Sequence, residues 1–281
     1  MVEVLVHFVA PALVGVLIGI ASGLLGIGGG TVMVPIFRLV FGMGATMSTA
    51  TSLFAIIPTS ISGAISHVKG KTCIPALGIA AGLGGACLSP VGVWLAQLSP
   101  DWLVMLAAAL IIGYSAINMF KKAFKLRPAG QPAAGVDASA PTADDSSLSR
   151  KQLLQGAAIG LVAGLASGYV GVGGGFIMVP LMLSIVGIPM RKASGTSLIA
   201  VMILAIPGVI EQGIIGNINY LAGIAIVIGT IPGAVIGARL VTKVPERTLR
   251  LLFGCFLIVA AVMLVLNEVG IFGQSSILSA N

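Results

Sequence analysis

The chain has few residues that could perform covalent or metal chemistry. Only 8% of its 281 residues are charged, and it contains two His and three Cys. Cys73, Cys87 and Cys255 stand apart among apolar residues, without the paired spacing of a zinc site or a redox motif. No Ser-His-Asp set, carboxylate pair or metal-ligand cluster can be assembled from so few groups. We therefore expect no catalytic residues, no metal and no cofactor, and we expect that the protein is not an enzyme.

Acidic residues are fewer than basic residues. The chain has 15 Lys and Arg against 8 Asp and Glu, which gives a net charge of +7. In a soluble domain this excess would suggest nucleic acid as a partner, but here the basic residues gather in short connections between apolar runs. There they orient a chain in the membrane. We expect no nucleic-acid partner.

What the chain has in abundance is apolar sequence, with 57% hydrophobic residues. Several runs approach or exceed the roughly 20 apolar residues that cross a bilayer. The composition predicts an all-α polytopic membrane protein. The predicted segments are 4–25, 31–42, 47–66, 73–96 and 102–120, followed by 153–170, 176–188, 194–210, 220–241 and 249–267.

One stretch differs from this apolar pattern. Residues 123–150 contain three prolines, small polar residues and several Asp in place of large apolar side chains. Such a composition is typical of a flexible linker. We predict a first transmembrane repeat over 1–122, a flexible cytoplasmic linker over 123–150, and a second transmembrane repeat over 151–281.

The two apolar parts are related to each other. Residues 21–35 recur as residues 166–180, 145 positions later, with 10 of 15 residues identical. The match continues at the same offset, and it includes the Thr-Ser-Leu triplets that begin at Thr51 and Thr196. Between these matches Pro58 finds its nearest counterpart in Pro207, which suggests one small insertion or deletion. The sequence therefore predicts two homologous repeats.

Each copy of the repeated stretch carries a glycine-rich run inside apolar sequence. Each interior Gly costs a helix roughly 1 kcal/mol relative to Ala, so we expect the helix to break here. Matching breaks in two halves of a membrane protein point to a transporter's substrate site, where backbone N–H groups at a helix start attract anions. Close helix packing is the alternative role for any single glycine. The substrate-binding candidates are Gly26, Gly28, Gly29 and Gly30, with Gly171, Gly173, Gly174 and Gly175.

Polar groups inside the apolar segments form two further symmetric pairs. The hydroxyls of Thr51-Ser52 and Thr196-Ser197 either donate to an oxyanion or bond back to their own backbone. His67 and Glu211 lie toward the ends of their segments, at roughly equivalent places in the two halves. Each is either a proton-coupling group or an interfacial residue.

The basic residues distinguish two topologies. With four crossings per half, the basic clusters of the second half would fall outside, against the positive-inside rule. With five crossings per half, every loop that carries a basic cluster falls inside, and the two repeats are inverted. At 1.5 Å per residue, segments 31–42 and 176–188 span only about 18–20 Å, so they cross with adjoining loop residues or are re-entrant. We favour ten segments with both termini outside, and eight full helices are the alternative.

The doubled Gly-x-Gly-Gly-Gly-x-x-x-Val-Pro motif ends at Pro35 and Pro180, and a Thr-Ser-Leu follows each copy. In these features the chain resembles the TauE/SafE family of sulfite and organosulfur anion exporters. The resemblance implies an inner-membrane permease for sulfite, sulfoacetate or a related small sulfur-containing anion, driven by an ion gradient. It also implies that the motif glycines, Thr51, Ser52, Thr196 and Ser197 bind the substrate.

These observations together favour an alternating-access transporter whose partners are a small anion and the lipid bilayer, with possible proton coupling. A permease for another small organic anion is one alternative. A non-transporting membrane scaffold, in which the glycines serve only packing, is another. A cation or metal transporter would need several carboxylates or His in its spans, and the sequence lacks them. The oligomeric state, the coupling ion and the transport direction stay open.

Overall fold

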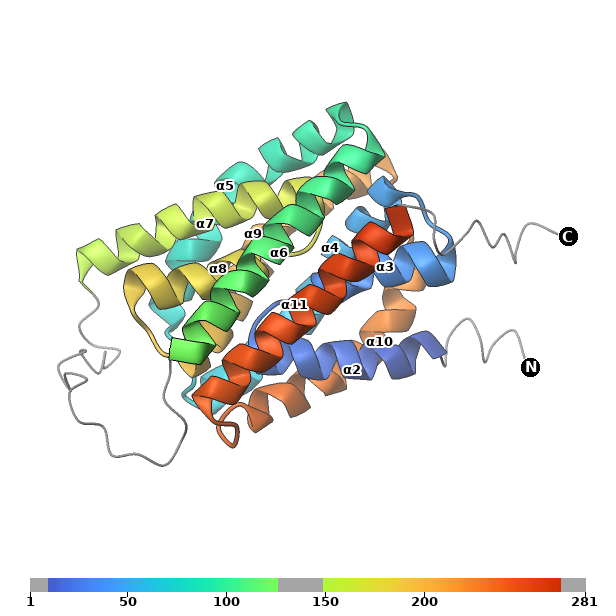
Figure 1. The fold of residues 1–281 in the computed structure, drawn as a ribbon. Helices are drawn as coiled ribbons and strands as arrows, with labels where there is room; N and C mark the ends of the chain where they lie inside the picture. The colour runs from blue at the N-terminus through green and yellow to red at the C-terminus, as the bar shows by residue number, and fades with distance from the viewer. Residues whose placement is uncertain (1–9, 126–148, 269–281) are drawn as a thin grey trace, which may run out of the picture.

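The computed structural model describes residues 10–125 and 149–268, and every regular element in these ranges is helical (Figure 1). The first half contains α2 (Ala10–Leu25), α3 (Gly30–Phe41), α4 (Ala45–Lys69), α5 (Pro75–Leu98) and α6 (Asp101–Lys125). The second half contains α7 (Arg150–Val170), α8 (Gly175–Leu181), the π-helical turn η2 (Met182–Val186), α9 (Met190–Ile215), α10 (Tyr220–Leu240) and α11 (Glu246–Glu268).

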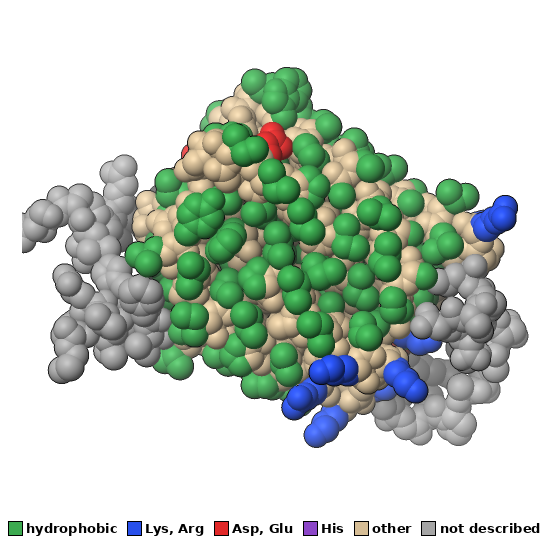
Figure 2. Space-filling model, turned by 180° about the vertical axis from the view of Figure 1, so that it is seen from behind, with side chains coloured by type: hydrophobic (Ala, Val, Ile, Leu, Met, Phe, Trp, Pro, Cys, Tyr) green, Lys and Arg blue, Asp and Glu red, His purple; other side chains and the backbone are tan. Residues whose placement is uncertain are grey.

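Seven of these helices, α4 to α7 and α9 to α11, are long and apolar enough to cross a membrane. Two shorter apolar helices cover residues 11–25 and 175–186. The face of the molecule that Figure 2 shows is covered with apolar side chains between the helix ends, as expected of a surface that faces lipid. The prediction of an all-α multi-pass membrane protein is therefore confirmed.

Helix starts recur at the offset that the sequence match gave. Helices α3 and α8 begin at residues 30 and 175, α4 and α9 at 45 and 190, and α5 and α10 at 75 and 220, each pair 145 apart. The predicted insertion near Pro58 is therefore wrong, because the offset is the same on both sides of it. Pro58 and Pro207 both lie inside helices and differ by about one helical turn from exact equivalence.

The helices of the two halves interleave. Helix α2 packs along α10 and α7 packs along α5, while α4 crosses α9 and α6 contacts α11. Exchanging the halves turns the α2–α10 contact into the α7–α5 contact and leaves the α4–α9 and α6–α11 contacts unchanged. Small residues allow the closest approaches, since a Cβ built at Gly19 of α2 would lie only 2.8 Å from the Thr230 Cα of α10. Gly19, which lies outside the two glycine-rich runs, thus serves helix packing.

The path of the chain explains how the short helices α3 and α8 complete their passage through the molecule. Gly23 near the end of α2 lies against Ala238, close to the end of α10, so α2 traverses most of the helical bundle. Helix α3 starts beside Ile56, halfway along α4, and returns to the end of the molecule where α2 starts (Figure 1). The second half repeats this path from the opposite end, with α7 followed by α8 and η2. The short segments thus complete their passage together with the glycine-rich residues that precede them.

Three basic connections gather at one end of the molecule. The backbone N–H of Ile74, in the α4–α5 connection, donates to Thr196 of α9, and Arg191 donates to the Val244 carbonyl between α10 and α11. Figure 1 places the end of α6 and the start of α7 at this end, and the start of α2 and the end of α11 at the other. The side of the membrane that each end faces, and the inverted arrangement with it, stays a prediction.

The predicted linker falls largely outside the described residues, since α6 continues to Lys125 and residues 126–148 are not described. The division into two repeats and a linker therefore stays a prediction.

Candidate functional site

The two glycine-rich loops have the same backbone conformation. Gly26, Gly28 and Gly29 have φ of +75°, +80° and +84°, and the equivalent Gly171, Gly173 and Gly174 have φ of +71°, +88° and +67°. This left-handed region is open to Gly at little cost and is unfavourable for other residues. The helix breaks that the sequence predicts at these positions are present in both halves.

The loops come from opposite ends of the molecule and meet in its middle. A Cβ built at Gly175 would lie 2.5 Å from the Gly26 carbonyl oxygen and 2.8 Å from that of Ile27. A Cβ at Gly30 would approach the Val172 carbonyl oxygen even more closely. Neither position has space for a side chain, so these two glycines are required where the loops touch.

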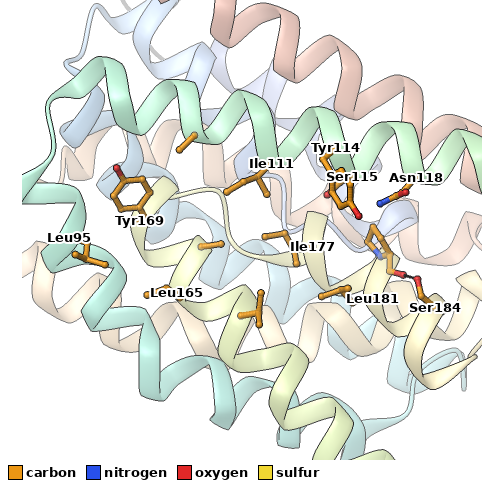
Figure 3. Close-up of a pocket in the computed structure, with 14 residues that line it drawn as sticks. Leu95, Ile111, Tyr114, Ser115, Asn118, Leu165, Tyr169, Ile177, Leu181 and Ser184 are labelled. Carbon is orange, nitrogen blue, oxygen red and sulfur yellow. Dashed lines mark hydrogen bonds between the residues drawn. The ribbon is translucent and has the colours of Figure 1, made fainter.

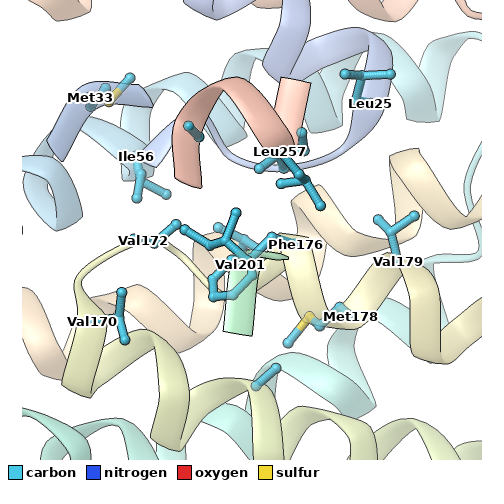
Figure 4. Close-up of a cluster of buried hydrophobic side chains, with 14 of the residues drawn as sticks. Leu25, Met33, Ile56, Val170, Val172, Phe176, Met178, Val179, Val201 and Leu257 are labelled. Atoms are coloured by element: carbon cyan, nitrogen blue, oxygen red, sulfur yellow. The ribbon is translucent and has the colours of Figure 1, made fainter. Parts of the chain in front are cut away.

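Apolar side chains surround the meeting point. Ile56 of α4 and Val201 of α9, themselves 145 residues apart, contact the loops from the two central helices (Figure 4). Both are buried, as are Ile27 and Val172 in the loops. The meeting point is therefore closed in this conformation, and a ligand reaches it only if the central helices or the loops move.

Backbone donors are available at the start of α3. Gly29 is its N-cap and provides no side-chain cap. Within the described residues, the N–H groups of Gly28–Gly30 donate no hydrogen bond. The second loop is similar at Gly173 and Gly174, but Gly175 donates to the Gly173 carbonyl (2.8 Å) and α8 has only seven residues. The first loop is therefore the stronger candidate for attracting an anion.

Three buried hydroxyls next to the first loop have no hydrogen-bond partner among the described residues: Ser22 of α2, Thr31 of α3 and Ser60 of α4. The Ser60 Oγ lies 3.6 Å from a Cβ built at Gly28, and the Ser22 Cβ lies 3.7 Å from one built at Gly29. Leaving a buried hydroxyl unpaired costs about 1–3 kcal/mol, so this cluster is a candidate site for a polar ligand or water.

Sequence reasoning missed these hydroxyls, although a signal was present. Ser22 and Ser167 are identical members of the repeated stretch, and both hydroxyls are buried without a partner among the described residues. Ser167 also lies beside its loop, with its Cβ 3.4 Å from one built at Gly174. A comparison of polar residues at the 145-residue offset would have found this pair.

The predicted serine pair divides between two environments. Ser197 of α9 donates to the Gly26 carbonyl (2.7 Å) and also lies 2.8 Å from the Ser194 carbonyl. It therefore fastens the first loop to α9. Its equivalent Ser52 is also buried, but it has no partner among the described residues.

The predicted threonine pair holds helix starts. Thr51 accepts a hydrogen bond from the backbone N–H of Asn219 (3.0 Å), and Thr196 accepts one from that of Ile74 (2.9 Å). Asn219 and Ile74 are the N-cap residues of α10 and α5, and each bond joins the two halves of the chain. Thr196 also bonds back to the backbone of its own helix, because its hydroxyl donates to the Lys192 carbonyl (2.7 Å).

His67 is fully buried at the end of α4. Its Nε2 lies 2.8 Å from the Gly23 carbonyl and its Nδ1 lies 2.7 Å from the Thr72 Oγ1. A nitrogen beside a carbonyl must donate, so the neutral ring accepts from Thr72 at Nδ1. His67 thereby satisfies a carbonyl in the last turn of α2, just before the first glycine-rich loop.

His67 and Glu211 lie at nearly, but not fully, equivalent positions. At the 145-residue offset the counterpart of His67 is Gln212, and the counterpart of Thr72 is Asn217. Asn217 donates to the buried Gln212 side chain (2.8 Å), so an amide pair replaces the His-Thr pair. Glu211 is the neighbouring residue, and its Oε2 is buried without a partner among the described residues.

A cavity of about 870 Å³ lies apart from the meeting point, between α5, α6, α7 and the α8–η2 segment (Figure 3). Tyr169 and Ile177, which flank the second loop, contribute to its wall. The predicted site and this cavity are therefore neighbours, but none of the predicted site residues lines it.

Comparison with known proteins gives a consistent result. The profile described as "Sulfite exporter TauE/SafE" matches residues 11–264. The chain is 28% identical over 280 residues to the "Probable membrane transporter protein YunE" of Bacillus subtilis, covering 94% of this chain and 99% of that protein. It is 25% identical over 271 residues to the "Probable membrane transporter protein MJ0441" of Methanocaldococcus jannaschii, covering 90% and 94%. No solved structure matches the chain significantly.

Proposed function

The chain belongs to the sulfite exporter TauE/SafE family, and from this premise we propose that it exports small sulfur-containing anions such as sulfite or sulfoacetate by alternating access. The broader assignment follows from the comparisons themselves: the protein is a multi-pass membrane transporter and not an enzyme. The substrate, the direction of transport, the location in the inner membrane, the cytoplasmic linker and the outside termini belong to the proposal.

The observation that carries the proposal is the cluster of free donors where the two loops meet. Unpaired N–H groups of Gly28–Gly30 and the hydroxyls of Ser22, Thr31 and Ser60 surround the start of α3. Neutral donors and a helix N-terminus stabilise an oxyanion without a buried positive charge. Such a site binds weakly enough to release its cargo, and discontinuous helices near the bilayer middle are where secondary transporters bind substrates.

The motif residues take different parts in this proposal. The glycines of both loops provide the backbone donors and the close approach of the loops, and Ser52 adds an unpaired hydroxyl. Ser197, Thr51 and Thr196 act by positioning, because they hold the first loop and the starts of α10 and α5.

For proton coupling, His67 is the stronger candidate. It joins the end of α4 to the last turn of α2, so protonation of Nδ1 would reverse its hydrogen bond with Thr72 and place a positive charge beside the first loop. Glu211 is the second candidate, as the acidic residue within α9.

The test is uptake of a panel of anions into proteoliposomes with and without an imposed pH gradient. The panel contains sulfite, sulfate, thiosulfate, sulfoacetate and acetate. We expect saturable, gradient-dependent flux of one sulfur-containing anion. Absence of flux for every anion, from protein that unfolds cooperatively on heating, would contradict the proposal and favour a non-transporting protein or another substrate class.

Variants of the unpaired hydroxyls test the site itself. Thr31→Val and Ser60→Ala remove no hydrogen bond from this structure, so we expect unchanged thermal unfolding. Each loses a bond to a charged substrate, so kcat/KM falls by about tenfold or more. Ser89→Ala is the matched control, since Ser89 is equally buried and unpaired but lies against Gly168 and Gly208. Equal flux in all three variants would place the substrate elsewhere.

A further inference from the structure

The cavity between α5, α6, α7 and the α8–η2 segment, called here the α6 groove, has an unusual lining. Most of its wall is apolar, and none of its lining residues is Asp, Glu, Lys, Arg or His. Three polar side chains of α6, namely Tyr114, Ser115 and Asn118, line it together (Figure 3). None of the three has a hydrogen-bond partner among the described residues. The groove therefore presents unused donors and acceptors within an apolar surface.

The position of these side chains is as informative as their chemistry. Ser115 is only 4% exposed and lines the groove, so its side chain is shielded from the outer surface. It stands near the middle of α6, which runs from Asp101 to Lys125. In a bilayer this is the depth of the hydrocarbon core, below the level of phospholipid headgroups.

The other half of the chain shows that the fold does not need these polar residues. At the 145-residue offset, Tyr114, Ser115 and Asn118 correspond to Val259, Ala260 and Met263 on α11, and Tyr169 corresponds to Leu24 on α2. The small Ala107 in the groove wall corresponds to the larger Leu252. The groove thus carries polar side chains and a small Ala107 at positions where its counterpart carries apolar side chains and the larger Leu252.

A second, independent irregularity lies at the same groove. The segment that follows the second loop ends in the π-helical turn η2, whereas the equivalent end of α3 is regular α-helix. Ser184 of η2 lines the groove and donates to the Pro180 carbonyl (2.6 Å). Single π-helical turns are frequent at functional sites.

We propose that the α6 groove binds a neutral amphiphile from the bilayer, a single alkyl chain that carries a hydroxyl, ester or amide group. The apolar wall buries the chain, and Ser115 and Asn118 bond the polar group. A charged headgroup is disfavoured because no opposite charge lines the groove to pair with it. The volume lies within the range of small-molecule sites in proteins. The proposal does not depend on which anion the protein transports.

The experiment uses the full-length protein in nanodiscs of phosphatidylethanolamine and phosphatidylglycerol. The probe is a monoacylglycerol with a photoreactive diazirine in its chain, and adducts are mapped by peptide mass spectrometry. We expect adducts on α6 and α7, competed by unlabelled monoacylglycerol, and few on α2 and α11. Equal labelling of both helix pairs would overturn the proposal.

Two variants replace residues of the groove with the residues at the equivalent positions of α11. Ser115→Ala with Asn118→Met removes the polar groups, and Ala107→Leu fills the space; each residue introduced is the one that α11 carries. We expect each to lower labelling about fivefold or more. Met263→Leu on α11 is the matched control and leaves labelling unchanged.

The two variants act by different means, so misfolding of one leaves the other as a test. Unchanged labelling of a folded variant would overturn the proposal. An alkyl sulfonate probe of the same chain length tests whether the groove binds an anion instead of a neutral amphiphile. If it labels the groove more strongly than the monoacylglycerol, the groove binds a charged ligand and the proposal fails.

Discussion

The two broken hairpins, α2–α3 and α7–α8–η2, agree in the backbone of their glycine-rich loops, but they differ in side chains and in the π-helical turn that ends the second hairpin. Both have three glycines in the left-handed region, both lead into a short helix that starts halfway through the molecule, and both touch the other loop. The threonine bonds also agree, since Thr51 and Thr196 each hold the N-cap of a helix in the opposite half. What the hairpins share is what two interleaved halves need to meet in the middle.

Their differences lie in polar side chains. The first hairpin is joined to α4 through His67, whereas an amide pair centred on Gln212 stands at the equivalent place in the second half. The first loop has Thr31 and Ser60 beside it, and their equivalents are Phe176 and Ala205. The second hairpin has the polar α6 groove beside it instead. The comparison therefore separates residues that build the fold from residues that give each half its own chemistry.

The largest expected effect is on the side of the membrane from which introduced cysteines are labelled. In a Cys-free background, Lys69→Cys and Lys192→Cys are labelled from the same side by an impermeant maleimide, and Asp101→Cys from the opposite side. This follows because the α4–α5 and α8–α9 connections lie at one end of the molecule. Labelling of Lys69→Cys and Lys192→Cys from opposite sides would rule out inverted repeats.

The next effect concerns the contact between the loops. We expect Gly30→Leu and Gly175→Leu each to prevent stable folding, because a side chain would collide with backbone carbonyls of the other loop. The measurement is the yield of monodisperse protein and its thermal unfolding temperature. Gly113→Ala is the control, since a Cβ there meets nothing within 4 Å. A difference between the two halves would show that the loops do not contribute equally.

His67→Gln makes the first half resemble the second. The amide can donate to the Gly23 carbonyl and accept from Thr72, so we expect thermal unfolding close to that of the wild type. Flux continues, but it no longer responds to an imposed pH gradient because the side chain does not titrate. If the gradient dependence persists in His67→Gln and disappears in Glu211→Gln, Glu211 is the coupling residue.

The smallest effect concerns the threonines. Thr51→Val and Thr196→Val leave a backbone N–H without its acceptor, at a cost of about 1–3 kcal/mol each. We expect the larger loss of stability for Thr196→Val, since its bond to Ile74 is buried and that of Thr51 to Asn219 is only partly so. Thr→Ser at either position keeps the acceptor and restores stability. Equal stability of the Val and Ser variants would show that these bonds contribute nothing.

Much of the fold could be predicted from the sequence because it depends on local properties. Apolar runs gave the helices, and the glycines gave the breaks, since few other residues adopt a positive φ. The helices extend beyond the apolar runs, as α9 does from the predicted 194–210 to Met190–Ile215, because polar residues continue a helix at the membrane surface. The predicted insertion near Pro58 is wrong because Pro207 lies one helical turn from the position equivalent to Pro58. A proline can change place by one turn between two repeats without any insertion in the chain.

The sequence by itself determined that this is a helical membrane protein, and it predicted two related halves, each broken at a glycine-rich loop. Those features follow from hydrophobicity, glycine conformation and internal repetition, all of which act along the chain. Only the tertiary structure decided which hydroxyls are bonded and which are free. Ser197 meets Gly26 across 171 residues of sequence and His67 meets Gly23 across 44. The α6 groove likewise exists only where four segments converge, and no local pattern encodes that convergence.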